Sequence, residues 1–270
     1  PAAEQVLERP ADAPPVAETI GVLRDRAMLR AMPPGPDGEA RYGLYESIQA
    51  YVREATAASA GHGDALVVAA RRRLLQWAQQ TGADLRKRAA GHDAVAALSR
   101  LATETDNLLV AYELALAEGD RDAALGLAGA LFPLFIERGP LGVLGRLYDA
   151  ALAGVTEPDG AKVDARVLAR ALTERAEVRV RGGQLLAAEE DADRALELAN
   201  EQQDAALQAL AWLQVGACRR RADRMTDAMR ALVEARQFAA DAGEVAIEAE
   251  ASHLFGCVYY DVGEHEPARR

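Results

Sequence analysis

Two side chains near the end of the sequence have the types and the spacing that chemistry requires. His253 and Cys257 are four residues apart, which places them on one face of a helix. Such a pair can ligate a metal ion or act as a base and a nucleophile. The third metal ligand would have to be His265, beyond an expected turn at Gly263, and no oxyanion-binding feature accompanies the thiol. We therefore expect no metal site and no catalytic site, only a pair that faces a groove.

The sequence contains no motif for nucleotide binding. Neither G-x4-G-K-[ST] nor a G-x-G-x-x-G that follows a strand occurs, so no P-loop or dinucleotide fold holds phosphates here. We expect no cofactor and no enzymatic activity. The sequence begins without Met and stops at Arg270 inside a repeat, so we expect it to be a piece of a longer protein.

Composition narrows the class of protein further. Hydrophobic residues make up 50% of the 270, which excludes a disordered tail, and 31 basic against 42 acidic side chains give a net charge of −11, which opposes binding to nucleic acid. Two cysteines, Cys218 and Cys257, are too few for a disulfide framework. With no apolar run of about 18 residues and no signal peptide, these features predict a cytoplasmic protein.

The first 58 residues differ from the rest. A helical pattern starts at Val16, two short extended runs (28–32 and 40–45) flank the turn sequence PPGPDGE, and a helical pattern returns at Glu46. Helix, hairpin and helix in this order are typical of the back half of a winged-helix module. The turn carries two acids and no base, and 46–54 carries two acids and one Arg, so contact with DNA is the less favoured alternative.

Beyond residue 60 the sequence is almost entirely helical, and it repeats. Apolar stripes such as Val67, Ala70, Leu74 and Trp77, or Val95, Leu98 and Leu101, alternate with glycine breaks, including Gly82, and give about ten helices. A 40-residue period relates three series of residues without gaps: Leu172, Trp212 and Ser252; Ala176, Gly216 and Gly256; and Ala188, Ala228 and Ala268. The small residues let the two helices of a pair approach, and each pair must stack on the next. The pattern resembles the tetratricopeptide (TPR) repeat, although a HEAT-like or armadillo-like array has a similar period.

We therefore predict an all-α fold, a TPR-like α-solenoid of antiparallel helix pairs with a small winged-helix-like remnant that contains one β-hairpin. The expected domains are the remnant (1–58), a helical linker (59–104), TPR-like helices (105–160) and TPR repeats whose last copy is incomplete (161–270).

Three further segments together resemble a known family, and one of them is Arg138-Gly139 with Ala150-Ala151-Leu152. The run 41–51, RYGLYESIQAY, is similar to the R-[YF]-x-L-x-E-[TS]-[IV]-x-x-Y sequence that closes the winged-helix module of signal-transduction ATPases with numerous domains, the NB-ARC-like STAND regulators. The run 104–120 is similar to the E-x-D-N-L…A-L-x-x-G-D signature of their helical sensor region, although Leu109 stands where an Arg is common. The resemblance implies a regulatory segment downstream of a nucleotide-binding domain that this sequence does not include.

A binding surface follows from the TPR pattern. In TPR arrays the first helix of each pair lines the groove, and the corresponding residues here include Arg181, Arg220, Arg221, His253 and Tyr260. Arginine forks suit carboxylates, so we expect this groove to hold an acidic peptide segment or a neighbouring domain. The alternative is that the arginines pair with nearby Asp and Glu of the same chain.

The predicted function is a non-catalytic protein–protein interaction and sensor segment of a larger multidomain signalling protein. The alternative is a DNA-binding transcriptional regulator that uses the winged helix, and a hydrolase built on the solenoid is a third reading. An open apolar end on the last repeat makes an oligomer possible.

Overall fold

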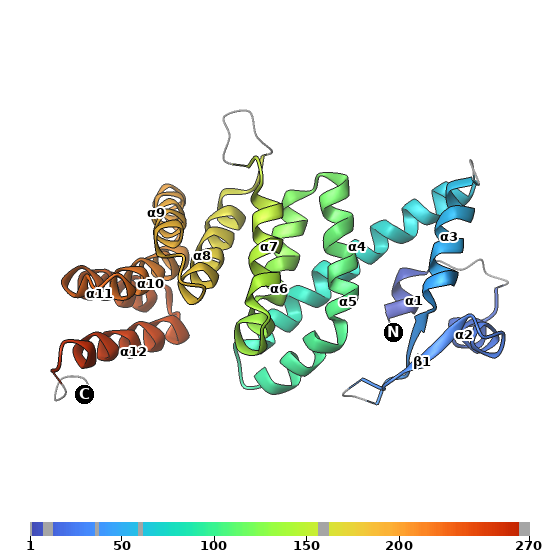
Figure 1. Ribbon diagram of the computed structural model, residues 1–270, viewed down its shortest axis with the longest axis horizontal. Coiled ribbons are helices and arrows are strands. Elements are labelled where there is room, and N and C mark those ends of the chain that lie inside the picture. The colour runs from blue at the N-terminus through green and yellow to red at the C-terminus, as the bar shows by residue number, and fades with distance from the viewer. Residues whose placement is uncertain (1, 8–12, 36–37, 59–61, 156–161, 265–270) are drawn as a thin grey trace. The chain divides into compact units, whose positions relative to one another are not determined.

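The computed structural model describes residues 2–7, 13–35, 38–58, 62–155 and 162–264. The chain divides into two compact units, residues 1–119 and 120–270. Within the described ranges every element is a helix except for one two-stranded antiparallel hairpin (Figure 1). The predicted all-α, solenoid-like fold class with a single β-hairpin is confirmed. In the same ranges, no helix has the length and apolar character needed to cross a membrane.

The first unit begins with the predicted helix and hairpin. Its elements are α1 (Ala2–Val6), α2 (Val16–Asp25), β1 (Leu29–Met32), β2 (Arg41–Leu44), α3 (Glu46–Ala58), α4 (His62–Ala89) and α5 (Ala94–Glu118). The strands pair in a register that places Leu29 opposite Leu44 and Met32 opposite Arg41. Ala27, with a φ of 56°, makes the turn from α2 into β1. The expected helix–hairpin–helix order is present; helix α1 was not expected.

The core of the first unit lies between α4 and α5, where Trp77, Leu85, Leu101 and Leu108 are buried. Two details of the sequence interpretation are wrong here. The break expected at Gly82 is absent, because α4 continues through it; one glycine costs a helix only about 1 kcal/mol, which a long buried face can offset. Val95 is 80% exposed rather than part of an apolar stripe, because it lies in the first turn of α5, away from the seam.

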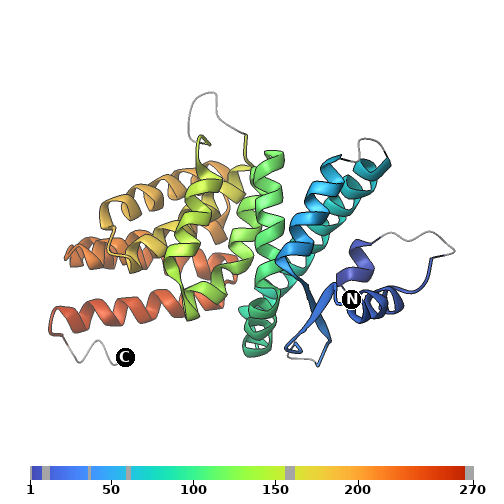
Figure 2. The same cartoon turned by 45° about the vertical axis from the view of Figure 1, so that its right-hand side comes forward.

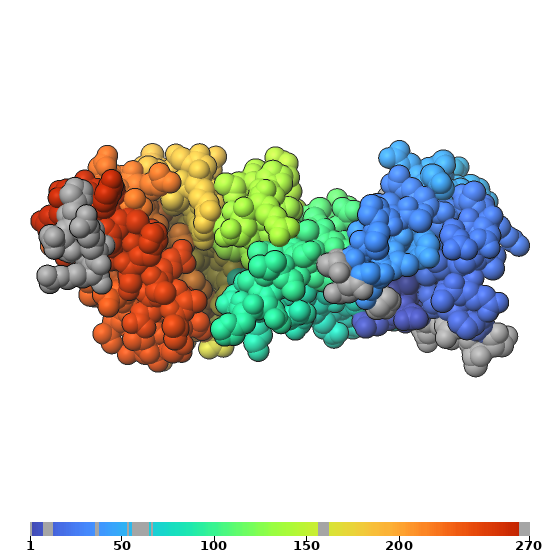
Figure 3. Space-filling view, turned by 90° about the horizontal axis from the view of Figure 1, so that it is seen from below, coloured from blue at the N-terminus to red at the C-terminus, as the bar shows by residue number. Residues whose placement is uncertain are grey.

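The second unit is a row of helix pairs. Its helices are α6 (Arg121–Arg138), α7 (Leu141–Leu152), α8 (Ala165–Arg181), α9 (Leu185–Gln202), α10 (Ala205–Arg221), α11 (Met225–Ala242) and α12 (Val245–Asp261). Consecutive helices pack as pairs, and α10 also packs against α8 before it and α12 after it (Figures 1 and 2). In a space-filling view these helices form adjacent bands of surface (Figure 3). The first helices of successive pairs are thereby neighbours.

The 40-residue period is visible in the backbone. Left-handed residues recur at the turn within each pair, at Gly183, Asp223 and Gly263, and again between pairs, at Gln203 and Gly243. These turns end the helices at equivalent points, so each pair presents the same face to the next. The 40-residue period is therefore a feature of the backbone geometry as well as of the sequence.

Four of the six small residues of the repeat, Ala176, Ala188, Gly216 and Ala228, are buried at helix seams, as predicted. Ala176, Ala188 and Ala228 are fully buried. A Cβ on Gly216 would lie 2.7 Å from Leu232 Cδ2 on α11. Gly256 is half-buried within α12, and Ala268 lies outside the described residues. Ser252, the departure from the large apolar position, is exposed and donates its hydroxyl to the Glu248 carbonyl at 2.8 Å.

The division into two units falls between Gly119 and Asp120. Gly119 is the left-handed cap of α5, and the Asp120 side chain caps α6 by accepting a hydrogen bond from the Ala123 amide at 3.0 Å. The boundary expected between 104 and 105 instead falls inside α5, because a hydrophobic pattern cannot distinguish one long helix from two adjoining ones.

Candidate partner-binding surface

The predicted site residues lie on the first helices of the pairs. Arg181 is in the last turn of α8, Arg220 and Arg221 are in the last turn of α10, and His253 and Tyr260 are on α12. We call the exposed side of α8, α10 and α12 that carries these five residues the first-helix face. Because α10 packs against both other helices, all five belong to one contiguous part of the second unit.

Two of the three arginines are already paired within the chain. Arg181 donates to Glu177 Oε1 through Nε at 3.0 Å and Nη2 at 2.7 Å, and its Nη1 lies 3.4 Å from the Ile136 carbonyl on α6. Arg220 Nε donates to Asp261 Oδ2 on α12 at 2.7 Å. The open alternative, pairing with acids of the same chain, therefore holds for Arg181 and Arg220. These contacts tie α8 to α6 and α10 to α12.

Arg221 differs from its two neighbours. It is exposed, and among the described residues it makes no ion pair and no hydrogen bond through its side chain. Its guanidinium therefore has its five donors in water. Of the three predicted arginines, Arg221 is the one whose charge is available to a partner.

Glu177 lies beneath Arg181, and its side chain is only 18% exposed. Burial raises the pKa of this carboxyl; Arg181 opposes the shift, and the negative charges of Glu250 on α12 and Glu174 add to it. Glu250 on α12 is therefore close enough to Glu177 on α8 for its negative charge to contribute to the raised pKa. The first-helix face therefore holds a mixture of charges rather than a purely basic spot.

His253 and Tyr260 are both exposed on α12, Tyr260 by 67%. His253 Nε2 lies 3.7 Å from Cys257 Sγ, so the expected same-face pair forms. His265, the expected third ligand, lies outside the described residues. Among the residues that are described, no group of three or more His, Cys, Asp and Glu side chains is placed to hold a metal ion.

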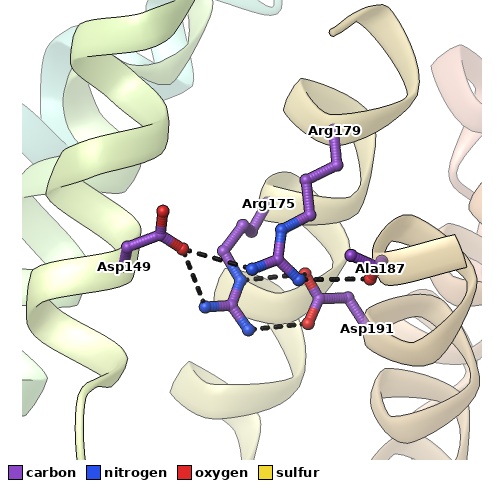
Figure 4. A network of polar contacts seen from close by, with 5 residues as sticks. All are labelled: Asp149, Arg175, Arg179, Ala187 and Asp191. Carbon is purple, nitrogen blue, oxygen red and sulfur yellow. Dashed lines mark hydrogen bonds and ion pairs between the residues drawn. The ribbon is translucent and has the colours of Figure 1, made fainter. Parts of the chain in front are cut away.

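An ion network, which sequence reasoning missed, joins α7, α8 and α9 and is buried at Asp191 but exposed at Asp149 (Figure 4). Asp191 accepts hydrogen bonds from Arg175 at 2.7 and 2.8 Å and from Arg179 at 2.7 Å. Both guanidinium groups also reach Asp149, at 3.1 and 3.2 Å, and Arg179 donates to the Ala187 carbonyl at 3.1 Å. Asp191 belongs to an acidic run, Glu189, Glu190 and Asp191, but it is 4% exposed and therefore not part of a solvated helix face.

The 40-residue repeat contains a pattern that indicates this network. Asp191 precedes Ala231 by 40 residues, and Arg175 precedes Val215 by the same interval; both of the later residues are fully buried. A charge at a position that is apolar in the next copy indicates a buried partner of opposite charge, because a lone buried charge is too costly. A second buried contact lies alongside, where the Tyr148 hydroxyl donates to Glu174 Oε2 at 2.5 Å.

Cys218 is buried on α10. Burial raises the pKa of its thiol to about 12, and the nearby carboxylates of Glu189 and Asp193 act in the same direction. At neutral pH this cysteine is a thiol, which is a weak nucleophile. It serves as a small packing residue between the pairs.

The hairpin of the first unit is held against α5. Glu39, just before β2, accepts a hydrogen bond from Arg100 at 2.6 Å, and Arg41 donates to the Thr103 carbonyl. Part of the PPGPDGE turn, Pro36 and Asp37, lies outside the described residues. In the described part of the turn, the acid Glu39 therefore binds α5 of its own unit.

No family model matches the chain, and no curated protein matches it.

Proposed function

We propose that this chain is a non-catalytic protein-interaction segment of a larger signalling protein, and that the first-helix face holds a segment of a partner or of a neighbouring domain. The observation that carries the proposal is the row of first helices: Arg221 and Tyr260 stand exposed on it, while ion pairs fix Arg181 and Arg220 beside them. A face whose paired side chains are already held in place loses little side-chain entropy when it binds.

A TPR assignment supports this reading. The small residues at the helix seams, the left-handed turns and the 40-residue period agree with stacked helix pairs of the TPR kind. Such arrays expose an extended surface built from equivalent positions of successive helices. The longer period compared with the usual 34 residues accompanies second helices of 18 residues, α9 and α11.

The partner we propose carries carboxylates. Arg221 presents a planar fork that matches a carboxylate, and Tyr260 offers a large amphipathic surface on the neighbouring helix. Arg221 would repel a basic partner, whereas an acidic partner would form a charge-assisted hydrogen bond with it. The ion pairs of the face, Arg181 with Glu177 and Arg220 with Asp261, add mainly specificity.

The proposed parent protein is a STAND-type regulator. The segment similar to the end of its winged-helix module covers β2 and the start of α3, and the segment similar to its sensor region covers the second half of α5. These positions fit a winged-helix remnant followed by helical sensor elements. DNA binding is the less favoured alternative, since Glu39 is paired with Arg100 and α3 begins with Glu46.

The experiment that tests the proposal is a selection of displayed random peptides on the immobilised chain. We expect enrichment of peptides with two or more acids, which bind the Arg221→Glu variant at least about fivefold more weakly. Arg230→Glu, at an exposed arginine on α11, is the matched control and should leave binding unchanged. Arg220 is unsuitable for this test, because a Glu there would repel Asp261 and disturb the contact between α10 and α12.

Two results would contradict the proposal. One is a selection that yields no peptides above background. The other is a set of peptides whose binding weakens equally in the Arg221→Glu and Arg230→Glu variants. Equal weakening would mean that the peptides respond to the net charge of the chain and not to the first-helix face.

A further inference from the structure

The first unit contains an open pocket, which we call the furrow. It lies between the end of α4 and the start of α5 and has a volume of about 360 Å³. Its lining consists of Gln80, Thr81, Asp84, Leu85 and Arg88 from α4 together with Ala96 and Arg100 from α5. Leu85 is buried at its base, and the remaining lining is mostly polar. This volume suits a small molecule rather than a peptide.

Arg88 has spare hydrogen-bonding capacity in this furrow. Its nearest carboxylates are Asp84 at 3.6 Å and Asp93 at 3.9 Å, distances too long for hydrogen bonds, and no described residue accepts one from its guanidinium. Both ion pairs are exposed to solvent, so displacing them costs little. An incoming anion could therefore form charge-assisted hydrogen bonds that the protein does not make now.

Arg100 connects the furrow to the hairpin. It lines the same furrow, and its side chain is 20% exposed. Its Nη1 donates to Glu39 at 2.6 Å and its Nη2 pairs with Glu104 at 2.9 Å. Glu104 is buried and on the same helix, whereas Glu39 belongs to the hairpin and is partly exposed. Glu39 is therefore the partner that another anion can replace.

The remaining lining also favours an anion. Thr81 and Gln80 supply a hydroxyl and an amide that can donate, and Ala96 lies in the first turn of α5, at the positive end of that helix dipole. Asp84 is the one acid among the lining residues, and it is well exposed. The two arginines outnumber it within the lining, and Asp93, Glu39 and Glu104 pair with them from outside the lining.

We propose that this furrow binds a small anion bearing a phosphate or carboxylate group between Arg88 and Arg100, and that the anion competes with Glu39 for Arg100. Occupation of the furrow would then loosen the attachment of the hairpin to α5. The site is separate from the first-helix face and does not depend on the function proposed for it.

The test uses the 270-residue chain labelled with ¹⁵N, titrated with inorganic phosphate and, separately, with succinate at constant ionic strength. We expect saturable shifts of the Arg88 and Arg100 Nε–H signals and of the Thr81 amide, with affinity in the millimolar range expected of an exposed site. Phosphate and succinate distinguish the two sources of the anionic group. Failure of both to give saturable shifts would overturn the site.

Three variants sharpen the result. Arg88→Gln should weaken binding about tenfold, and Arg72→Gln, at an exposed position elsewhere on α4, should leave it unchanged. Glu39→Gln removes the competing charge and should tighten binding by about threefold or more. Equal affinities in the Arg88 and Arg72 variants would refute the site, and an unchanged affinity in Glu39→Gln would refute the competition.

Discussion

At the scale of the single residue, Asp191 on α9 is the buried acid of the network through which Arg175 and Arg179 on α8 also reach Asp149 on α7. Its carboxylate accepts three hydrogen bonds from Arg175 and Arg179 and is 4% exposed. Removing one partner of a buried ion pair leaves the other charges uncompensated, whereas exchanging the whole set for apolar residues can be nearly neutral. The repeat supplies the apolar version, because Val215 and Ala231 occupy the positions of Arg175 and Asp191 one period later.

Asp191→Ala should therefore destabilise the second unit by about 3 kcal/mol. The double variant Arg175→Val, Asp191→Ala should recover more than half of that loss, since Arg179 keeps Asp149 and the Ala187 carbonyl as partners. Urea unfolding followed by circular dichroism measures both. Glu197→Ala, which breaks an exposed ion pair with Arg194 on the same helix, is the control and should change stability by less than about 0.5 kcal/mol. A double variant no more stable than the single one would contradict this account.

The first-helix face shows what can be predicted from the sequence at the scale of single residues and what cannot. The repeat together with the TPR resemblance predicts that Arg181, Arg220, Arg221, His253 and Tyr260 lie on the first helices, and all five are on α8, α10 and α12. Which arginines are already paired depends on acids brought near by folding. Asp261 is 41 residues from Arg220, and helical periodicity within one helix carries no information about such a partner.

At the scale of the element, close packing of α10 against α11 depends on the absence of a side chain at Gly216. A Cβ there would lie 2.7 and 2.8 Å from Cδ2 and Cγ of Leu232, and Leu232 is itself fully buried, so it has no free space to move into. Alanine normally favours a helix over glycine. At this seam glycine is the more stable choice, because the methyl group of an alanine would overpack the contact and force the helices apart.

Gly216→Ala should destabilise the second unit by about 1–3 kcal/mol. Gly126→Ala is the matched control, because Gly126 is also inside a helix of this unit but has open space where a Cβ would be placed, and it should stabilise by about 0.5–1 kcal/mol. Thermal and urea unfolding of the two variants give opposite signs if the seam is as tight as described. Stabilisation by both substitutions would show that α10 and α11 tolerate a wider spacing.

Elements whose signals are local were predicted well. The hairpin, the helix at Val16 and the turns after α8 and α10 follow from turn residues and hydrophobic spacing. The errors occur where tertiary burial overrides a local signal: Gly82 lies inside α4, and α5 crosses the expected boundary at 104. Short α1 is anchored by Arg73, which donates to the Val6 carbonyl at 2.7 Å, a contact between residues 67 positions apart.

At the scale of the whole molecule, the chain is two units with separate cores. Buried apolar residues of α4 and α5 form the core of the first, and the stacked pairs from α6 to α12 form that of the second. In a stacked array each pair is stabilised mainly by its neighbours. Stability should therefore depend on whether a fragment keeps complete pairs rather than on its length alone.

Fragment 120–270 should consequently fold by itself and unfold in urea at nearly the midpoint that its signal shows in the full chain. Gly216→Ala should lower that midpoint by the same amount in both contexts, because α10, α11 and their shared seam lie within the fragment. A shorter fragment, 120–224, retains α10 but lacks α11, so it exposes Leu213 and the Gly216 seam and should unfold at a clearly lower urea concentration. Circular dichroism at 222 nm follows all three proteins. If 120–224 proved as stable as 120–270, the pair would not be the unit of stability, and the stacking that places α8, α10 and α12 side by side would need a different physical basis.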